Sequence, residues 1–65
     1  MDSAIIKIRG DLNMSRCMNV VDGFEYIECV IRSAVKSKLN ITITSHRLDG
    51  SHAVEWIIKN GEVIA

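Results

Sequence analysis

Apolar and polar residues alternate along three stretches of the chain, which is the pattern of a half-buried β-strand. Residues 3–9 alternate around alanine and isoleucine, and residues 41–46 begin by alternating isoleucine with threonine. The second of these stretches is also rich in β-branched side chains, which favour strands. Residues 14–21 alternate as well, yet a helix could begin within them. We therefore predict two strands and, over 14–21, either an irregular segment or a short strand.

Between these stretches, apolar residues recur three and four positions apart, which predicts an amphipathic helix. The apolar stripe runs from Phe24 to Leu39. Asp22 is the predicted N-cap, and Glu25 three residues later completes a capping-box pattern. Asn40 is the residue expected to end the helix.

The closing hairpin is predicted from one dipeptide. Asn60-Gly61 is the preferred centre of a two-residue type I′ turn, because both positions need positive φ. This turn places Ile57 opposite Ile64 and Trp56 opposite Ala65. The hairpin therefore carries apolar residues on both of its faces.

A second dipeptide, Asp49-Gly50, predicts the preceding hairpin. A two-residue turn there places Arg47 opposite His52. Both registers assign the same residues to the core face of the sheet, and such agreement between independent signals strengthens the assignment. The predicted core residues of these strands are Ile41, Ile43, Val54, Trp56, Ile58 and Val63.

The pattern predicts an α+β fold in β-α-β-β-β order, with one helix packed on a three- to four-stranded, mostly antiparallel sheet. Residues 1–65 are long enough for one compact domain only, and a chain of this size buries about 60% of its unfolded surface. A core this small favours association with a partner. The first strand is expected beside one of the later strands, without a choice between them.

Composition narrows the function classes. Eight Lys and Arg residues balance eight Asp and Glu residues, whereas a nucleic-acid-binding protein usually has a basic surplus. No segment resembles a signal peptide or a membrane span, and the two cysteines form no redox or disulfide pattern. We expect a cytoplasmic protein without cofactor, metal or membrane partner.

Apolar residues outside the predicted core point to a partner surface. Ile5, Ile57 and Ile64 fall on the outer sheet face, and Tyr26 and Val30 lie off the main stripe of the helix. These five residues are the candidate contacts with a protein partner or with a second copy in a homodimer. The alternative is that β-branched residues fill exposed strand positions because they fit the pleat.

The segment from His46 to His52 has the densest chemistry, although its ligand spacing does not match a zinc site. Its Arg47-Leu-Asp-Gly-Ser-His52 stretch resembles the Arg-x-x-Gly-Ser-His stretch of the HicA family of small toxin ribonucleases. The resemblance implies RNA cleavage by His52, on a sheet-and-helix fold related to double-stranded-RNA-binding domains. This sequence continues with Ala53-Val54-Glu55 rather than with basic or aromatic residues, and its charge is neutral.

The apolar partner surface and the resemblance of residues 47–52 lead to two different predicted functions. The first is a small, non-catalytic, intracellular binding or regulatory protein that acts by protein–protein contact as a homodimer, analogous in size and fold to phage and mobile-element inhibitors. The alternative is a nucleic-acid-directed protein, either the His52-dependent ribonuclease or an RNA-binding protein. RNA binding would use Lys7, Arg9, Arg47 and Lys59.

Overall fold

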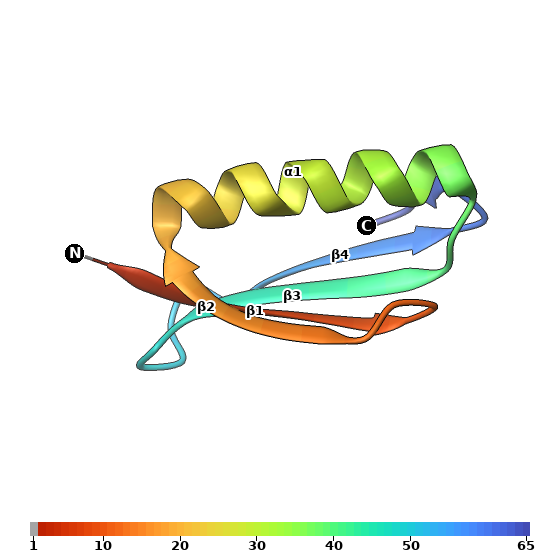
Figure 1. Ribbon diagram of the computed structural model, residues 1–65. Helices are drawn as coiled ribbons and strands as arrows, with labels where there is room; N and C mark the ends of the chain where they lie inside the picture. Colours follow the sequence, from red (N-terminus) through yellow and green to blue (C-terminus); the bar gives the residue numbers. More distant parts are fainter. Residues whose placement is uncertain (1) are drawn as a thin grey trace.

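A computed structural model describes residues 2–65 as one helix on a five-stranded antiparallel sheet (Figure 1). The elements follow each other in the order β1 (Ser3–Gly10), β2 (Met14–Asn19), α1 (Val20–Ser37), β3 (Ile41–Arg47), β4 (Val54–Lys59) and β5 (Glu62–Val63). The predicted α+β class is confirmed. The strand count is five, and the order is β-β-α-β-β-β, because residues 14–19 form a full strand.

The sheet has the strand order β2-β1-β3-β4-β5, so the first strand lies between β2 and β3. Every neighbouring pair is antiparallel. β1 occupies this central position because alternate residues on it, Ala4, Ile6 and Ile8, are all buried under the helix. The outward-facing residues of β1 lie on the opposite sheet face, which no other element covers (Figure 1).

The helix begins three residues earlier than predicted. Asn19, not Asp22, is the N-cap: the Asn19 side chain accepts a hydrogen bond from the Asp22 backbone N–H at 2.8 Å. The Asn19 amide also donates to the Asp22 carboxylate at 2.8 Å, so the capping box uses this pair and not Glu25. The helix ends at Ser37, followed by the C-cap Lys38 in a left-handed conformation, and does not extend to Asn40 as predicted.

The closing hairpin has the predicted turn, with positive φ at both Asn60 and Gly61. Its register is confirmed for Lys59 opposite Glu62 and for Ile58 opposite Val63. The register changes at the last residue, because the Ile57 N–H donates to the Ala65 carbonyl while the Ile64 N–H donates to Ile57. Ala65 therefore lies against Ile57 and not opposite Trp56 as predicted.

The hairpin between β3 and β4 has the predicted strand register but a different turn. Ser45 lies opposite Val54, as expected. However, the Gly50 N–H donates to the Arg47 carbonyl and the Arg47 N–H donates to Ser51, so the turn has three central residues. The extra turn residue shifts the pairing by one position, and a bulge at His52, which has positive φ, shifts it back. The residues predicted for the core face therefore still lie on that face.

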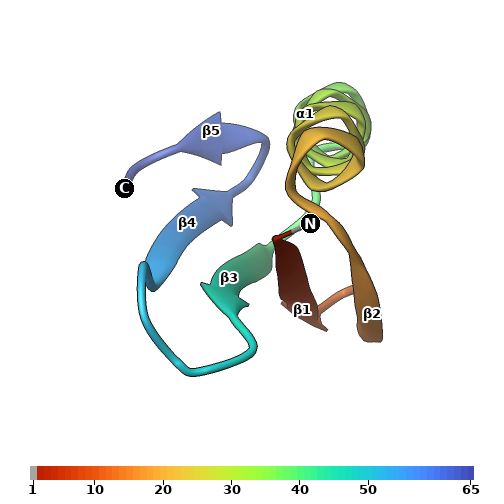
Figure 2. The ribbon, with the colours of Figure 1, turned by 90° about the vertical axis from the view of Figure 1, so that its left-hand side faces the viewer.

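The core is narrower than predicted. Seven buried residues form its centre, all of them alanine or isoleucine, namely Ile6, Ile8, Ile27, Ala34, Ile41, Ile43 and Ile58. Figure 2 shows the reason: α1 lies over β1 and β2, while β4 and β5 curve away from β1 and β2 on the other side of the helix. Val54 and Val63 were predicted as core residues and Phe24 as part of the buried stripe, but all three are exposed.

Candidate functional site

The main candidate site is a groove of about 300 Å³ between the first half of α1 and the adjoining ends of β3 and β4. The groove lies on the helix side of the sheet. Apolar side chains form most of its wall, and basic residues lie at one end. We call it the apolar groove; its lining residues are Ala4, Val20, Phe24, Ser45, His46, Arg47, His52, Val54 and Trp56.

The apolar groove exists because one helix is too narrow for this sheet. Five strands at a spacing of about 4.8 Å extend over roughly 19 Å, whereas a helix with its side chains is about 10–12 Å wide. Since α1 lies over β1 and β2, the Val54 end of β4 is left uncovered, whereas Ile58 near its other end is fully buried. Trp56 is half-buried there, opposite the fully buried Ile43. Phe24 is 64% exposed and Val54 is 49% exposed.

The polar groups at the end of the groove are mainly basic. Arg47 lies at the end of β3, and its guanidinium is 3.3 Å from the carboxylate of Asp2. His46 lies opposite Ile5, so its ring is on the outer sheet face, where Nδ1 donates to the Arg47 carbonyl oxygen at 2.9 Å. His52 also lines this end of the groove. This end of the groove therefore favours a ligand with a carboxylate beside an apolar group.

The hydrogen bonds of the turn fix the orientation of the His52 ring. Ser51 Oγ lies 2.6 Å from Asp49 Oδ1 and 2.9 Å from His52 Nδ1. An ionised carboxylate only accepts, so the Ser51 hydroxyl donates to Asp49 and accepts from His52. The hydrogen bond from the Ser51 hydroxyl and that from its backbone N–H lower the pKa of Asp49. The Ser51 hydroxyl thus points its proton at Asp49, and His52 donates from Nδ1, which leaves Nε2 as the acceptor nitrogen of the ring.

The outer sheet face brings only part of the predicted apolar patch together. Ile57 and Ile64 lie side by side, since the Ile64 N–H donates to the Ile57 carbonyl at 2.9 Å. Ile5 is opposite His46, whereas Ile57 is opposite Thr42 at the other end of β3. Two strand spacings and four residues along the strand separate Ile5 from Ile57, which is on the order of 15 Å.

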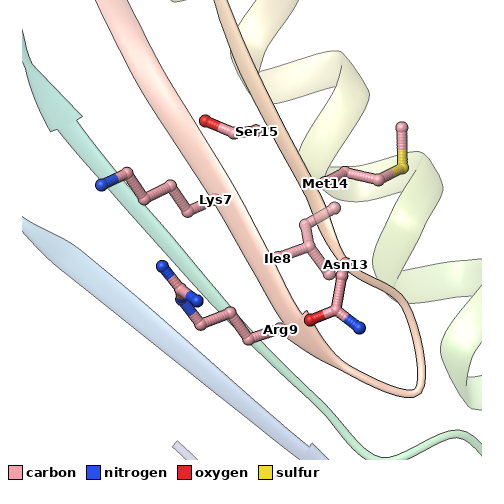
Figure 3. Close-up of a pocket in the computed structure, with 6 residues that line it drawn as sticks. All are labelled: Lys7, Ile8, Arg9, Asn13, Met14 and Ser15. Atoms are coloured by element: carbon pink, nitrogen blue, oxygen red, sulfur yellow. The ribbon is translucent and has the colours of Figure 1, made fainter.

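The predicted basic residues are divided between the two faces. Lys7 and Arg9 lie side by side on the outer face, next to a shallow hollow of about 430 Å³ that Asn13 and Ser15 also line (Figure 3). Arg47 pairs with the buried Ala4 and therefore belongs to the helix side. Lys59 lies opposite Glu62, so its charge has an acidic neighbour.

The remaining basic pair does not form an isolated positive surface. Thr44 lies between Lys7 and Glu55 in the sheet, opposite one on each side. Glu55 therefore lies on the same face as Lys7 and Arg9. Backbone phosphates are bound by several basic groups acting together. The outer face is thus a mixed-charge surface, in which Arg9 lies beside Lys7 and also shares a hollow with Lys59.

The predicted helix contacts, Tyr26 and Val30, are half-buried and pack against the core. The Tyr26 hydroxyl lies 3.3 Å from Met14 Sδ, and the Arg16 guanidinium lies 5.4 Å from the centre of the Tyr26 ring. Tyr26 therefore attaches the helix to β2. Within residues 2–65, no group of three metal-binding side chains comes together, and no helix has the length and hydropathy of a membrane span.

The sequence analysis missed the apolar groove because it treated the whole apolar stripe of the helix as buried. Phe24, Val54 and Trp56 were all assigned to the core. One available signal was the alternation over 14–21: a strand there makes the sheet wider than one helix can cover. Comparison of the chain with protein-family models, curated proteins and solved structures finds no match.

Proposed function

We propose that this chain is a small, non-catalytic, intracellular binding protein that regulates a partner by protein–protein contact. The observation that carries the proposal is the apolar groove, where an aromatic residue and a valine remain exposed around the half-buried Trp56. The occupant we propose is a segment of a partner protein that presents an aromatic or long aliphatic side chain with a carboxylate beside it.

The apolar part of the groove supplies the affinity in this proposal. Phe24 and Val54 border a concave apolar surface whose lining includes Trp56. Burying one large apolar side chain contributes roughly 1.5–3 kcal/mol. Aromatic anchors in pockets are also the usual centres of binding energy at protein interfaces. An apolar anchor that contacts both Phe24 and Trp56 would bury several such surfaces at once.

The basic end of the groove supplies the orientation. Arg47 is partly exposed, and its ion-pair partner is Asp2, whose side chain is 65% exposed. An exposed ion pair contributes little to stability, about 0–1 kcal/mol, so a ligand carboxylate can replace Asp2 at low cost. His52 lies at the same end and becomes positively charged when it is protonated.

The rest of the chain agrees with a binding role. Cys17 and Cys29 are both free and exposed, which favours a reducing, cytoplasmic compartment. The chain's two histidines, His46 and His52, hydrogen-bond to local backbone and turn groups.

Trp56 gives a direct test because it is the only tryptophan in the chain. Peptides selected from a random display library on the immobilised protein would be titrated while the Trp56 fluorescence is recorded. We expect the selected peptides to share an aromatic or aliphatic residue next to Asp or Glu. Phe24→Asp should weaken their binding at least tenfold, and Arg47→Gln should weaken the acidic peptides selectively.

Val21→Asp is the matched control for Phe24→Asp. Val21 is 69% exposed on the same helix but does not line the groove. Both variants should keep the circular dichroism spectrum of the parent chain, and only Phe24→Asp should lose binding. Selected peptides without a common apolar anchor, or equal losses in the two variants, would contradict the proposal.

A further inference from the structure

The two edges of the sheet differ in how they are protected. The β5 edge is only two residues long, and the charged pair Lys59 and Glu62 flanks its turn. The β2 edge has six residues, Met14–Asn19, without proline, glycine or lysine. Short or charged edges prevent pairing with another chain, whereas a long, uncharged edge favours it. The one charge of β2, Arg16, lies over the Tyr26 ring of its own chain.

The backbone of β2 has free hydrogen-bonding groups at alternate residues. The Val20 N–H donates to the Asp2 carbonyl in continuation of the β1–β2 register, so even-numbered residues of β2 bond to β1. The β1–β3 register leads to the same alternation. The Asp11 N–H donates to the Asn40 carbonyl in continuation of this register, so odd-numbered residues of β1 bond to β3 and even-numbered ones to β2. The N–H and C=O groups of Ser15 and Cys17 and the N–H group of Asn19 therefore point away from the sheet, while the Asn19 carbonyl accepts the first hydrogen bond of the helix.

We propose that this edge binds a second copy of the chain, with the two β2 strands antiparallel about a two-fold axis at Cys17. Both sheets then join into one, with both helices on the same face. The symmetric pairing places Cys17 opposite Cys17 of the second copy and Ser15 opposite Asn19. These pairs bring all three outward-pointing residues into hydrogen-bonding positions.

The side chains of β2 select this register over its neighbour. Shifting the axis to Arg16 would place the two arginines directly opposite each other, and like charges at opposed positions are destabilising. With the axis at Cys17, Arg16 lies opposite Met18 of the second copy. A shift to Met18 leaves Ser15 without a partner in β2. The axis at Cys17 therefore gives the most hydrogen bonds without opposed charges.

The outer face adds an apolar contact to these hydrogen bonds. Ile5 lies opposite Cys17 in the β1–β2 register and is half-buried. The paired edges would form a continuous row from Ile5 through both Cys17 residues to Ile5 of the second copy. On the opposite face, Tyr26 lies on the β2 side of α1, so the second helix would approach this residue. The inference is independent of the proposed groove ligand, because it uses a different edge of the sheet.

The two cysteines provide the main test. Cys29→Ser retains only Cys17, and Cys17→Ser retains only Cys29, which is exposed on α1. Opposed Cα atoms in a hydrogen-bonded antiparallel pair are about 5.5 Å apart, within the range of disulfides. Under mild oxidation by copper phenanthroline, we expect Cys29→Ser to form a covalent dimer and Cys17→Ser to remain a single chain on a non-reducing gel.

Sedimentation of the reduced protein tests the same interface without cross-linking. The parent chain should sediment with twice its monomer mass at high micromolar concentration. Cys17→Lys places two lysines opposite each other at the axis and should halve that mass, whereas Cys29→Lys should not change it. Circular dichroism identifies any variant that is unfolded, and Ser15→Lys then replaces Cys17→Lys.

Amide exchange gives a second measurement that needs no substitution. The amides of Ser15, Cys17 and Asn19 should exchange more slowly as the protein concentration rises. A parent chain that stays monomeric would overturn the proposal. So would a dimer that survives Cys17→Lys, or cross-linking through Cys29 to the same extent as through Cys17.

Discussion

At the residue scale, Gly61 is the residue at which the closing hairpin packs against the backbone of the helix end. Gly61 has a φ of +77°, and a Cβ atom built there would lie 2.8 Å from the Val35 carbonyl oxygen. The same atom would lie 3.1 Å from Lys38 Cα. The turn between β4 and β5 thus packs directly against the end of α1. A side chain at Gly61 would push the hairpin away from the helix.

Comparing two glycine substitutions separates the cost of this contact from the cost of positive φ. Gly50 has a similar φ of +85°, but a Cβ atom there meets nothing within 4 Å. We expect Gly50→Ala to lower the free energy of unfolding by about 1 kcal/mol, the cost of a left-handed alanine. Gly61→Ala should cost at least about 1 kcal/mol more, because atoms must move to admit the methyl group. Urea unfolding measures both; equal losses would show that the contact is unimportant.

At the element scale, Asn19 connects the strand β2 to the helix α1. Its backbone completes β2 opposite Ser3, and its side chain caps α1 by two hydrogen bonds to Asp22. The strand therefore continues into the helix without a loop. This direct connection places α1 over β1 and β2, and leaves the Val54 end of β4 uncovered.

The capping role of Asn19 predicts a stability difference between substitutions at Asn19 and at Glu25. Asn19→Ala should lower the free energy of unfolding by about 1 kcal/mol, since it removes the acceptor for the Asp22 N–H. Glu25→Ala should change it by less than about 0.5 kcal/mol, because Glu25 takes no part in the cap. Thermal and urea unfolding of both variants measure this difference. A larger loss in Glu25→Ala would support the cap predicted from the sequence.

The element pattern was predictable where local signals are strong. The alternation of β1 and β3 and the Asn60-Gly61 turn gave correct strands and correct register. The strand at 14–19 was not decided, because a short alternating stretch before a helix fits both structures. The three-residue turn at 48–50 was missed, since its departure from a two-residue turn depends on the bulge at His52. The groove could not be derived from either hairpin, because it results from where the helix lies on the whole sheet.

At the scale of the whole molecule, two surfaces remain uncovered for different physical reasons. The apolar groove is open because one helix is narrower than five strands. The β2 edge is open because it is a strand with unpaired backbone groups. β1 and β3 separate β2 from β4 in the sheet, and Phe24 and Tyr26 lie on different sides of α1. A second copy at the β2 edge and a partner segment in the apolar groove would therefore contact different surfaces.

This separation predicts that the two binding activities are independent. Phe24→Asp should abolish peptide binding and leave the sedimentation of the dimer unchanged, while Cys17→Lys should do the reverse. Because the sites share no residues, the effects in the double variant should add within about 0.5 kcal/mol. Ile57→Thr with Ile64→Thr should change neither activity, since both residues lie on the outer face beyond β3. Fluorescence titration and sedimentation of the same samples test this, and loss of both activities in either single variant would show that the groove and the edge are coupled.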